Sequence, residues 1–166
     1  LKRASHAAKN YSGEITQVTI DYIDQEQNVL IANTEGIFVE DKRVRTRMLI
    51  RAVAEYGGQL ETGFVGPGAL MGLEFYDTID IEEYAKEAAR IAKTMVYADY
   101  SPVGVMPVVI DNGFGGLMFH EACGHSLEAS SVAKGVSVFS NKLGQKIAAD
   151  LVTLIDDGSI PNSWGS

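Results

Sequence analysis

Alternating apolar and polar residues dominate the stretch from Glu14 to Gly63, and this pattern constrains the fold more than any other feature of the sequence. In the segment EITQVTIDYID, strand-favouring residues recur with a period close to two, the side-chain period of a β-strand. The segments GIFVED and VRTRMLIRAVAEYGG follow, separated by turn signals at 34–36 and 57–58. Short strands joined by tight turns, with no helix between them, predict an antiparallel meander.

One long helix is predicted over 80–100, where the sequence reads DIEEYAKEAARIAKTMVYADY. Asp80 is a suitable N-cap, and Glu83 stands three residues later, as in an acidic version of the capping box. Apolar residues, many of them alanine, recur every three or four positions and form one stripe. Because alanine is small, we expect this stripe to pack closely on the sheet as core and not to bind a cofactor.

Beyond the helix, which ends at Ser101-Pro102, the sequence predicts a strand–helix–strand segment. The strands are expected over 104–113 and 151–158, and the helix over GLMFHEACGHSLEA. The expected fold class is therefore α+β: an antiparallel β-meander with one long packing helix, then the segment that carries HExxxH. We expect an α+β middle domain over 1–100 and the start of a truncated second domain over 101–166.

The charge and cysteine content narrow the function classes. A formal net charge of −8 argues against direct nucleic-acid binding, which requires clustered lysine and arginine. The richest basic run, 42–47, alternates and is expected on the solvent face of a strand. One cysteine cannot form an internal disulfide, so a reducing compartment is expected. No apolar run reaches the roughly 20 residues of a membrane span.

Two of the three histidines stand within HEACGH, at 120–125, whereas His6 lies in an unpatterned N-terminal segment and is expected to be frayed and solvated. In H-E-x-x-H the two histidines are four residues apart, and their side-chain directions differ by about 40° around the helix axis. For histidines five residues apart the directions differ by about 140°. His120 and His125 can therefore share a metal ion only if the helix is locally widened, as in a π-bulge. Gly124 would ease this, so we predict a distorted helix at 122–124.

On a widened turn, His120 and His125 would be two neutral nitrogen ligands for zinc, and Glu121 the general base. A catalytic zinc ion usually has three protein ligands, and the sequence motif does not identify the third. Cys123 is expected to face the core. Glu128 could be a metal ligand, or it could instead hold a histidine ring in one tautomer. A purely structural histidine pair is the alternative to a metal site. The residues considered as third ligand are Cys123, Glu128, Asp156 and Asp157.

The motif FHEACGHSLEA, with S-x-F-S-x-x-x-G at 137–144 and DDG-x-I-P at 156–161, resembles the metallopeptidase region of the TldD/PmbA family, once labelled modulators of DNA gyrase. The likeness is close over 103–166, and 1–100 is similar in character to the middle domain. The resemblance implies zinc-dependent, cytoplasmic proteolysis of small or unfolded polypeptides by a homodimer or a pair of family subunits.

The resemblance also implies residue roles: His120 and His125 as zinc ligands, Glu121 as the catalytic glutamate, and a cysteine beyond Ser166 as the third ligand. The chain is then a fragment with an incomplete site, expected to be inactive and to hold metal weakly or not at all. The alternative is a catalytically incomplete polypeptide-binding or assembly module of the same family. The strand-rich segment 1–100 favours it, because exposed sheet edges bind extended chains.

Overall fold

The structure, a computed structural model, describes residues 1–165, except for the side chain at position 114. The chain divides into two compact units. The first comprises Leu1–Tyr100 together with the C-terminal turn that begins at Asp157, and the second is Ser101–Asp156.

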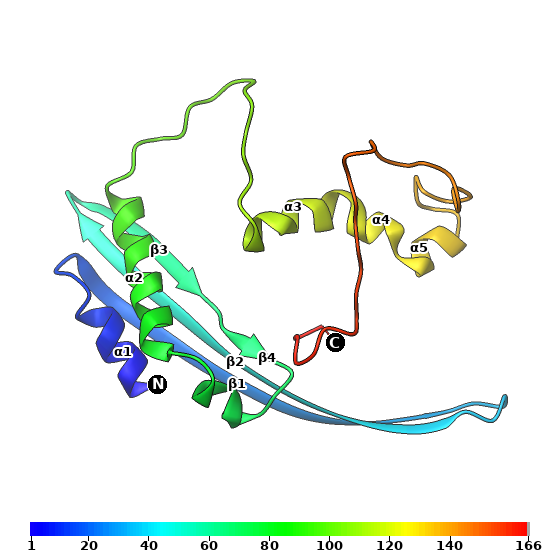
Figure 1. The fold of residues 1–166 in the computed structure, drawn as a ribbon. Coiled ribbons are helices and arrows are strands. Elements are labelled where there is room, and N and C mark those ends of the chain that lie inside the picture. Colours follow the sequence, from blue (N-terminus) through cyan, green and yellow to red (C-terminus); the bar gives the residue numbers. More distant parts are fainter. Residues whose placement is uncertain (166) are drawn as a thin grey trace. The chain divides into compact units, whose positions relative to one another are not determined.

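The first unit is built on an antiparallel sheet in the order β1-β2-β3 (Figure 1). Its strands are β1 (Ile15–Ala32), β2 (Phe38–Tyr56) and β3 (Gln59–Val65), and the short β4 (Gly68–Ala69) pairs with β2. The predicted meander and the α+β class are thus confirmed. The two sequence segments expected after the first turn form one continuous strand, β2.

Helix α2 (Ile81–Val96) packs on one face of this sheet (Figure 1). The Asp80 side chain accepts hydrogen bonds from the backbone N–H groups of Glu82 and Glu83, so the predicted N-cap is confirmed. The helix ends at Val96, four residues before the predicted end at position 100. A 3₁₀ turn, η1 (Leu73–Asp77), precedes it.

The expectation of a frayed N-terminal segment is wrong. Lys2–Lys9 form helix α1, which packs against α2 and β1. Ala4 and Ala8 are fully buried, whereas His6 is exposed and its ring lies within hydrogen-bond distance of the Asn10 amide. An eight-residue helix is marginal in isolation, so α1 depends on tertiary packing that its sequence pattern does not reveal.

The core between α2 and the sheet consists largely of small residues. On α2 the fully buried residues are Ala85, Ala88, Ala89 and Ala92. They face Ile50, Ala52 and Ala54 of β2 and the backbone of β3. A Cβ atom at Gly63 would lie 1.9 Å from the carbonyl oxygen of Ala88 and 2.5 Å from the Ala92 nitrogen. The helix backbone therefore rests directly on the strand, as the alanine stripe predicted.

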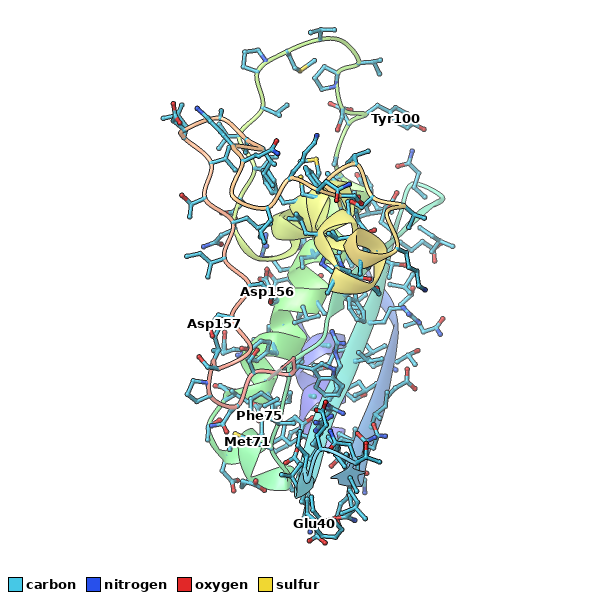
Figure 2. The ribbon with its side chains drawn as sticks, turned by 90° about the vertical axis from the view of Figure 1, so that its right-hand side faces the viewer. Glu40, Met71, Phe75, Tyr100, Asp156 and Asp157 are labelled. Atoms are coloured by element: carbon cyan, nitrogen blue, oxygen red, sulfur yellow. The ribbon has the colours of Figure 1, made fainter. Side chains whose placement is uncertain are left out.

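The β1–β2 ladder continues to the pair Ala32–Phe38 at its far end. Figure 1 shows this end as a two-stranded ribbon extending beyond the helices, and Figure 2 labels Glu40 near its tip. The basic run 42–47 begins in this ribbon and ends where β2 pairs with β4. Lys42 is exposed, and the three arginines of the run are half-buried. Thr46, within the run, is fully buried, so only part of the run faces solvent as predicted.

The second unit contains short helices within 113–133 and irregular chain elsewhere. The two strands predicted over 104–113 and 151–158 are absent from the described chain, and this part of the prediction is wrong. Val105 is 109% and Leu151 is 99% exposed. A strand requires a neighbouring strand to pair its backbone groups, and neither segment has one among the described residues. None of the helices in the described residues is long and apolar enough to cross a membrane.

Candidate metal centre

The HEACGH motif lies on a helix that changes its winding along its length. It begins with a 3₁₀ turn, η2 (Gly113–Gly116), and α3 (Leu117–Phe119). The π-helical segment η3 (His120–Gly124) follows, and then α4 (His125–Leu127). The predicted distortion at 122–124 is confirmed, since the widened turn spans the residues between the two histidines.

The widened turn brings the two imidazoles and the intervening glutamate together. The ring centroids of His120 and His125 lie 4.4 Å apart, and their planes are inclined by 65°. Oε2 of Glu121 lies 3.7 Å from Nε2 of His125. The three residues each offer one ligand atom, and these atoms lie within 4.8 Å of one another. On a regular helix the rings would point about 140° apart.

Gly124 contributes by its lack of a side chain. A Cβ atom at this position would lie 3.3 Å from Nδ1 of His120, closer than most real Cβ contacts. The backbone of Gly124 has ordinary right-handed helical angles, with φ −58° and ψ −54°, so the need for glycine here is steric. Backbone freedom was the reason expected for glycine at this position; the structure shows instead that its lack of a side chain leaves room for the His120 ring.

Glu128 forms a hydrogen bond with His125, the contact expected of a residue that holds a histidine ring in place. The helix breaks at this residue, where ψ is 132°, and the side chain turns back toward the motif. Its Oε1 lies 2.7 Å from Nδ1 of His125. This hydrogen bond, with the nearby charge of Glu121, raises the pKa of His125. When the ring is neutral, Nδ1–H donates to Glu128 and Nε2 remains available on the side of Glu121.

Within the described residues of the second unit, the other candidates for a third ligand do not join the group. Cys123 is half-buried and is not among the grouped ligand atoms of the described residues. Asp157 accepts hydrogen bonds from the backbone and hydroxyl of Ser159, at 2.9 and 2.6 Å. Figure 2 labels Asp156 and Asp157 side by side in the segment that leads to the C-terminal turn. The described residues thus offer two histidines and a carboxylate, with no further histidine or cysteine ligand.

Serine side chains of the stretch 137–144 form hydrogen bonds with the backbone near the end of the helix that carries the motif. The Ser137 hydroxyl donates to the carbonyl oxygen of Ser126 and accepts from the backbone N–H of Phe139. The Ser140 hydroxyl donates to the carbonyl oxygen of Val132, at 3.3 Å. The sequence pattern does not reveal this role, because the hydrogen bonds join residues 11 and 8 positions apart in the sequence and do not follow a local periodicity.

The donor set fits a transition-metal ion such as zinc. Two imidazoles and a carboxylate are ligand types that zinc accepts, at about 2.0–2.2 Å each. Atoms within 4.8 Å of one another can converge on one ion with small side-chain movements. His120, His125 and Glu121 are exposed, which leaves room for a further ligand and for a substrate.

Replacing Glu128 with glutamine should weaken metal binding about 10- to 100-fold near pH 8, because His125 loses the carboxylate that holds its ring. The pKa of His125 should also fall toward its ordinary value, since the raised pKa depends on that bond. Metal binding requires the neutral ring, so proton competition in the variant should begin at lower pH. Titration of metal affinity between pH 5 and about 8 measures both effects.

Glu35→Gln, a matched change in the exposed turn of the hairpin, is the control and should leave affinity and its pH dependence unchanged. An unchanged affinity in Glu128→Gln would show that the hydrogen bond seen in the structure does not position the ligand.

Comparison with known proteins gives matches along both parts of the chain. The family model described as "PmbA/TldA metallopeptidase central domain" matches residues 1–96. The model described as "PmbA/TldA metallopeptidase C-terminal domain" matches residues 103–166.

Among curated proteins, the chain is 34% identical to a metalloprotease TldD homolog of Buchnera aphidicola, over 100% of the chain and 36% of that protein. It is also 34% identical to a TldD homolog of Haemophilus influenzae, with the same coverage. A metalloprotease of Methanothermobacter thermautotrophicus is 33% identical over 98% of the chain and 35% of its own length. The chain therefore spans about a third of the length of these relatives.

A solved structure has a similar fold. It is a candidate modulator of a DNA gyrase from Thermotoga maritima, which matches with a TM-score of 0.71 and 25% identity. The match covers 87% of this chain and 32% of that one.

Proposed function

Because the chain belongs to the PmbA/TldD metallopeptidase family, we propose that it carries the metal-binding helix of a zinc-dependent peptidase that hydrolyses small or unfolded polypeptides. The observation that supports this most directly is the grouping of His120, Glu121 and His125 on one widened turn. The relatives are named metalloproteases. Since the chain covers 36% of the first relatives, the activity is proposed for the protein at its natural full length.

Zinc bound at this centre would activate a water molecule for attack and polarise the peptide carbonyl. His120 and His125 would hold the ion as neutral imidazoles, and the hydrogen bond to Glu128 would keep the His125 ring in the tautomer that exposes Nε2. Oε2 of Glu121 lies 3.7 Å from Nε2 of His125, and this nearness to the proposed metal ligand supports the role of general base. The Glu121 carboxylate takes one proton from the attacking water and delivers it to the leaving amine nitrogen as the C–N bond breaks.

Three further parts of the proposal rest on the family resemblance. The third ligand is a cysteine that lies outside the described residues. The active protein is a homodimer or pairs with a second family subunit, and it works in the cytoplasm, in keeping with a single free cysteine. Direct nucleic-acid binding forms no part of the proposal, because the chain has a net charge of −8.

The test is a metal and activity measurement on the protein at its natural full length. The purified protein should contain about one zinc ion per chain, as expected for a single catalytic site, and should cleave an unfolded polypeptide. A chelator should abolish cleavage, and added zinc should restore it. A protein that takes up no metal, or cleaves equally well in the chelator, contradicts the enzyme proposal. Stoichiometric polypeptide binding without cleavage would instead support the alternative, a catalytically incomplete binding or assembly module.

A further inference from the structure

One face of the sheet in the first unit carries a row of arginines. The buried residues of β2 stand at even-numbered positions from 46 to 54, and most belong to the core shared with α1 and α2. Side chains alternate across a strand, so the odd-numbered residues of β2 lie on the opposite face, away from that core. Four of them are arginines, at positions 43, 45, 47 and 51. We call this side of the sheet the arginine face.

The register of the sheet places no acidic residue directly across from these arginines in the described strands. Opposite charges in facing positions stabilise a sheet, and here neutral residues occupy those positions. The residues of β1 opposite the four arginines, in the same order, are Gln27, Gln25, Ile23 and Thr19. On the other side of β2, Gly68 is opposite Arg47, and Phe64 is opposite Arg51.

One of the four arginines is paired with a carboxylate within the described chain. Nε of Arg43 lies 2.6 Å from Oδ2 of Asp41. Nε of Arg45 is buried and has no hydrogen-bond partner among the described residues. A buried donor of a charged group costs free energy when it has no acceptor, so the structure calls for an acceptor at Arg45.

Aromatic side chains stand beside the arginines. The guanidinium carbon of Arg47 lies 5.6 Å from the centre of the Trp164 ring, which belongs to the C-terminal turn of the same unit. Phe64 is 46% exposed. A Cβ atom at Gly66 would lie 3.3 Å from both Nη2 of Arg47 and Cζ of Phe64, so these two side chains border the same spot. An irregular segment of chain therefore already rests against one arginine of the row.

We infer that the arginine face is a docking surface for an acidic, extended stretch of the polypeptide substrate, separate from the stretch that is cleaved. The identification of the ligand as a substrate rests on the proposed peptidase function. Guanidinium groups bind carboxylates through paired, charge-assisted hydrogen bonds. Alternate side chains of an extended polypeptide are roughly 6.8 Å apart, which is also the spacing of alternate arginines along β2.

The charge of the chain favours a polypeptide over a nucleic acid as the ligand. The net charge is −8, so a polyanion is repelled by the molecule as a whole. A nucleic-acid strand carries one negative charge per nucleotide. A polypeptide with a few acidic residues carries less charge, and it can place these residues on the arginines alone.

The experiment measures binding of labelled peptides to the protein at its natural full length by fluorescence anisotropy. The ligands are an unfolded acidic peptide, its counterpart with asparagine and glutamine in place of the acids, and a single-stranded oligonucleotide of similar length. We expect the acidic peptide to bind about tenfold more tightly than the neutral one, and salt to reduce the difference. The same acidic stretch joined to a cleavable peptide should lower KM and leave kcat unchanged.

Two variants test the arginines. The double variant Arg45→Gln with Arg51→Gln should bind the acidic peptide about five- to tenfold more weakly, because two charge-assisted contacts are lost. Arg51→Gln alone, at an exposed position, should weaken binding about threefold, and it keeps the test decisive if the change at the half-buried Arg45 perturbs folding. Arg90→Gln is the matched control, since Arg90 is paired with Glu87 on α2, and it should bind like the original protein.

The outcomes separate the docking surface from the peptidase proposal, because binding requires no chemistry. Selective binding of the acidic peptide by a protein that cleaves no polypeptide would support the surface and refute the peptidase. Equal binding of the acidic and neutral peptides, or unchanged binding in both variants, would refute the inference. Tighter binding of the oligonucleotide would also refute it. So would a face covered by another part of the protein or a second copy, seen as protection of Arg51→Cys from a thiol reagent.

Discussion

Replacing Glu121 with glutamine is expected to slow peptide hydrolysis by about 10²- to 10⁴-fold, the usual contribution of a general base. Glutamine has nearly the same shape but cannot accept a proton at neutral pH. The two imidazole ligands and the hydrogen bond from His125 to Glu128 are untouched, so the metal content should match that of the unaltered protein. Single-turnover cleavage of an unfolded peptide, together with metal analysis of the same sample, measures both.

Glu40→Gln is the matched control, since Glu40 lies near the tip of the hairpin, in the first unit (Figure 2). Its cleavage rate should be that of the unaltered protein. If Glu121→Gln cleaves at the original rate, Glu121 is not the base. If the variant loses metal and activity together, Glu121 serves as a ligand, which its position within 4.8 Å of the histidine nitrogens also allows.

Replacing Gly63 with alanine is expected to lower the free energy of unfolding of the first unit by at least about 3 kcal/mol. The new Cβ atom would lie 1.9 Å from the Ala88 carbonyl oxygen and 2.5 Å from the Ala92 nitrogen. Both are backbone atoms of α2, so the helix itself must move away from β3, and the alanine core behind it loses contact. Urea denaturation followed by circular dichroism measures the change, and the melting temperature should fall by about 10 °C or more.

Gly13→Ala is the matched control. A Cβ atom at Gly13 would meet nothing within 4 Å, and its φ lies outside the left-handed region. This variant should stay within about 0.5 kcal/mol of the original stability. A Gly63→Ala protein that unfolds within about 1 kcal/mol of the original would show that the close contact between α2 and β3 is easily relaxed.

The first unit was largely predictable because its elements depend on local patterns. Alternation over 14–63 predicted the meander, and the alanine stripe with Asp80 at its start predicted α2. Helix α1 was missed because it is short and its stability comes from burying Ala4 and Ala8 against neighbouring elements. The predicted strands of the second unit fail for a related reason: apolar character favours a strand, but only a pairing partner creates one.

The metal centre, too, was predictable from the sequence only in part. A shared metal ion at His120 and His125 already called for a widened turn, since a regular helix points the two rings about 140° apart, and the structure has that turn. Whether Glu128 would be a third ligand or hold a histidine ring was open from the sequence. The break in the helix at this residue turned its carboxylate to Nδ1 of His125.

By itself, then, the sequence determined the strands of the meander, the long capped helix and the need for a π-turn between the two histidines. These follow from periodicities of about two and about 3.6 residues, which neighbouring residues set among themselves. The tertiary structure decided that α1 forms by burying Ala4 and Ala8, and how closely α2 approaches Gly63. Those features depend on contacts between separate segments, whose free energy no local pattern encodes.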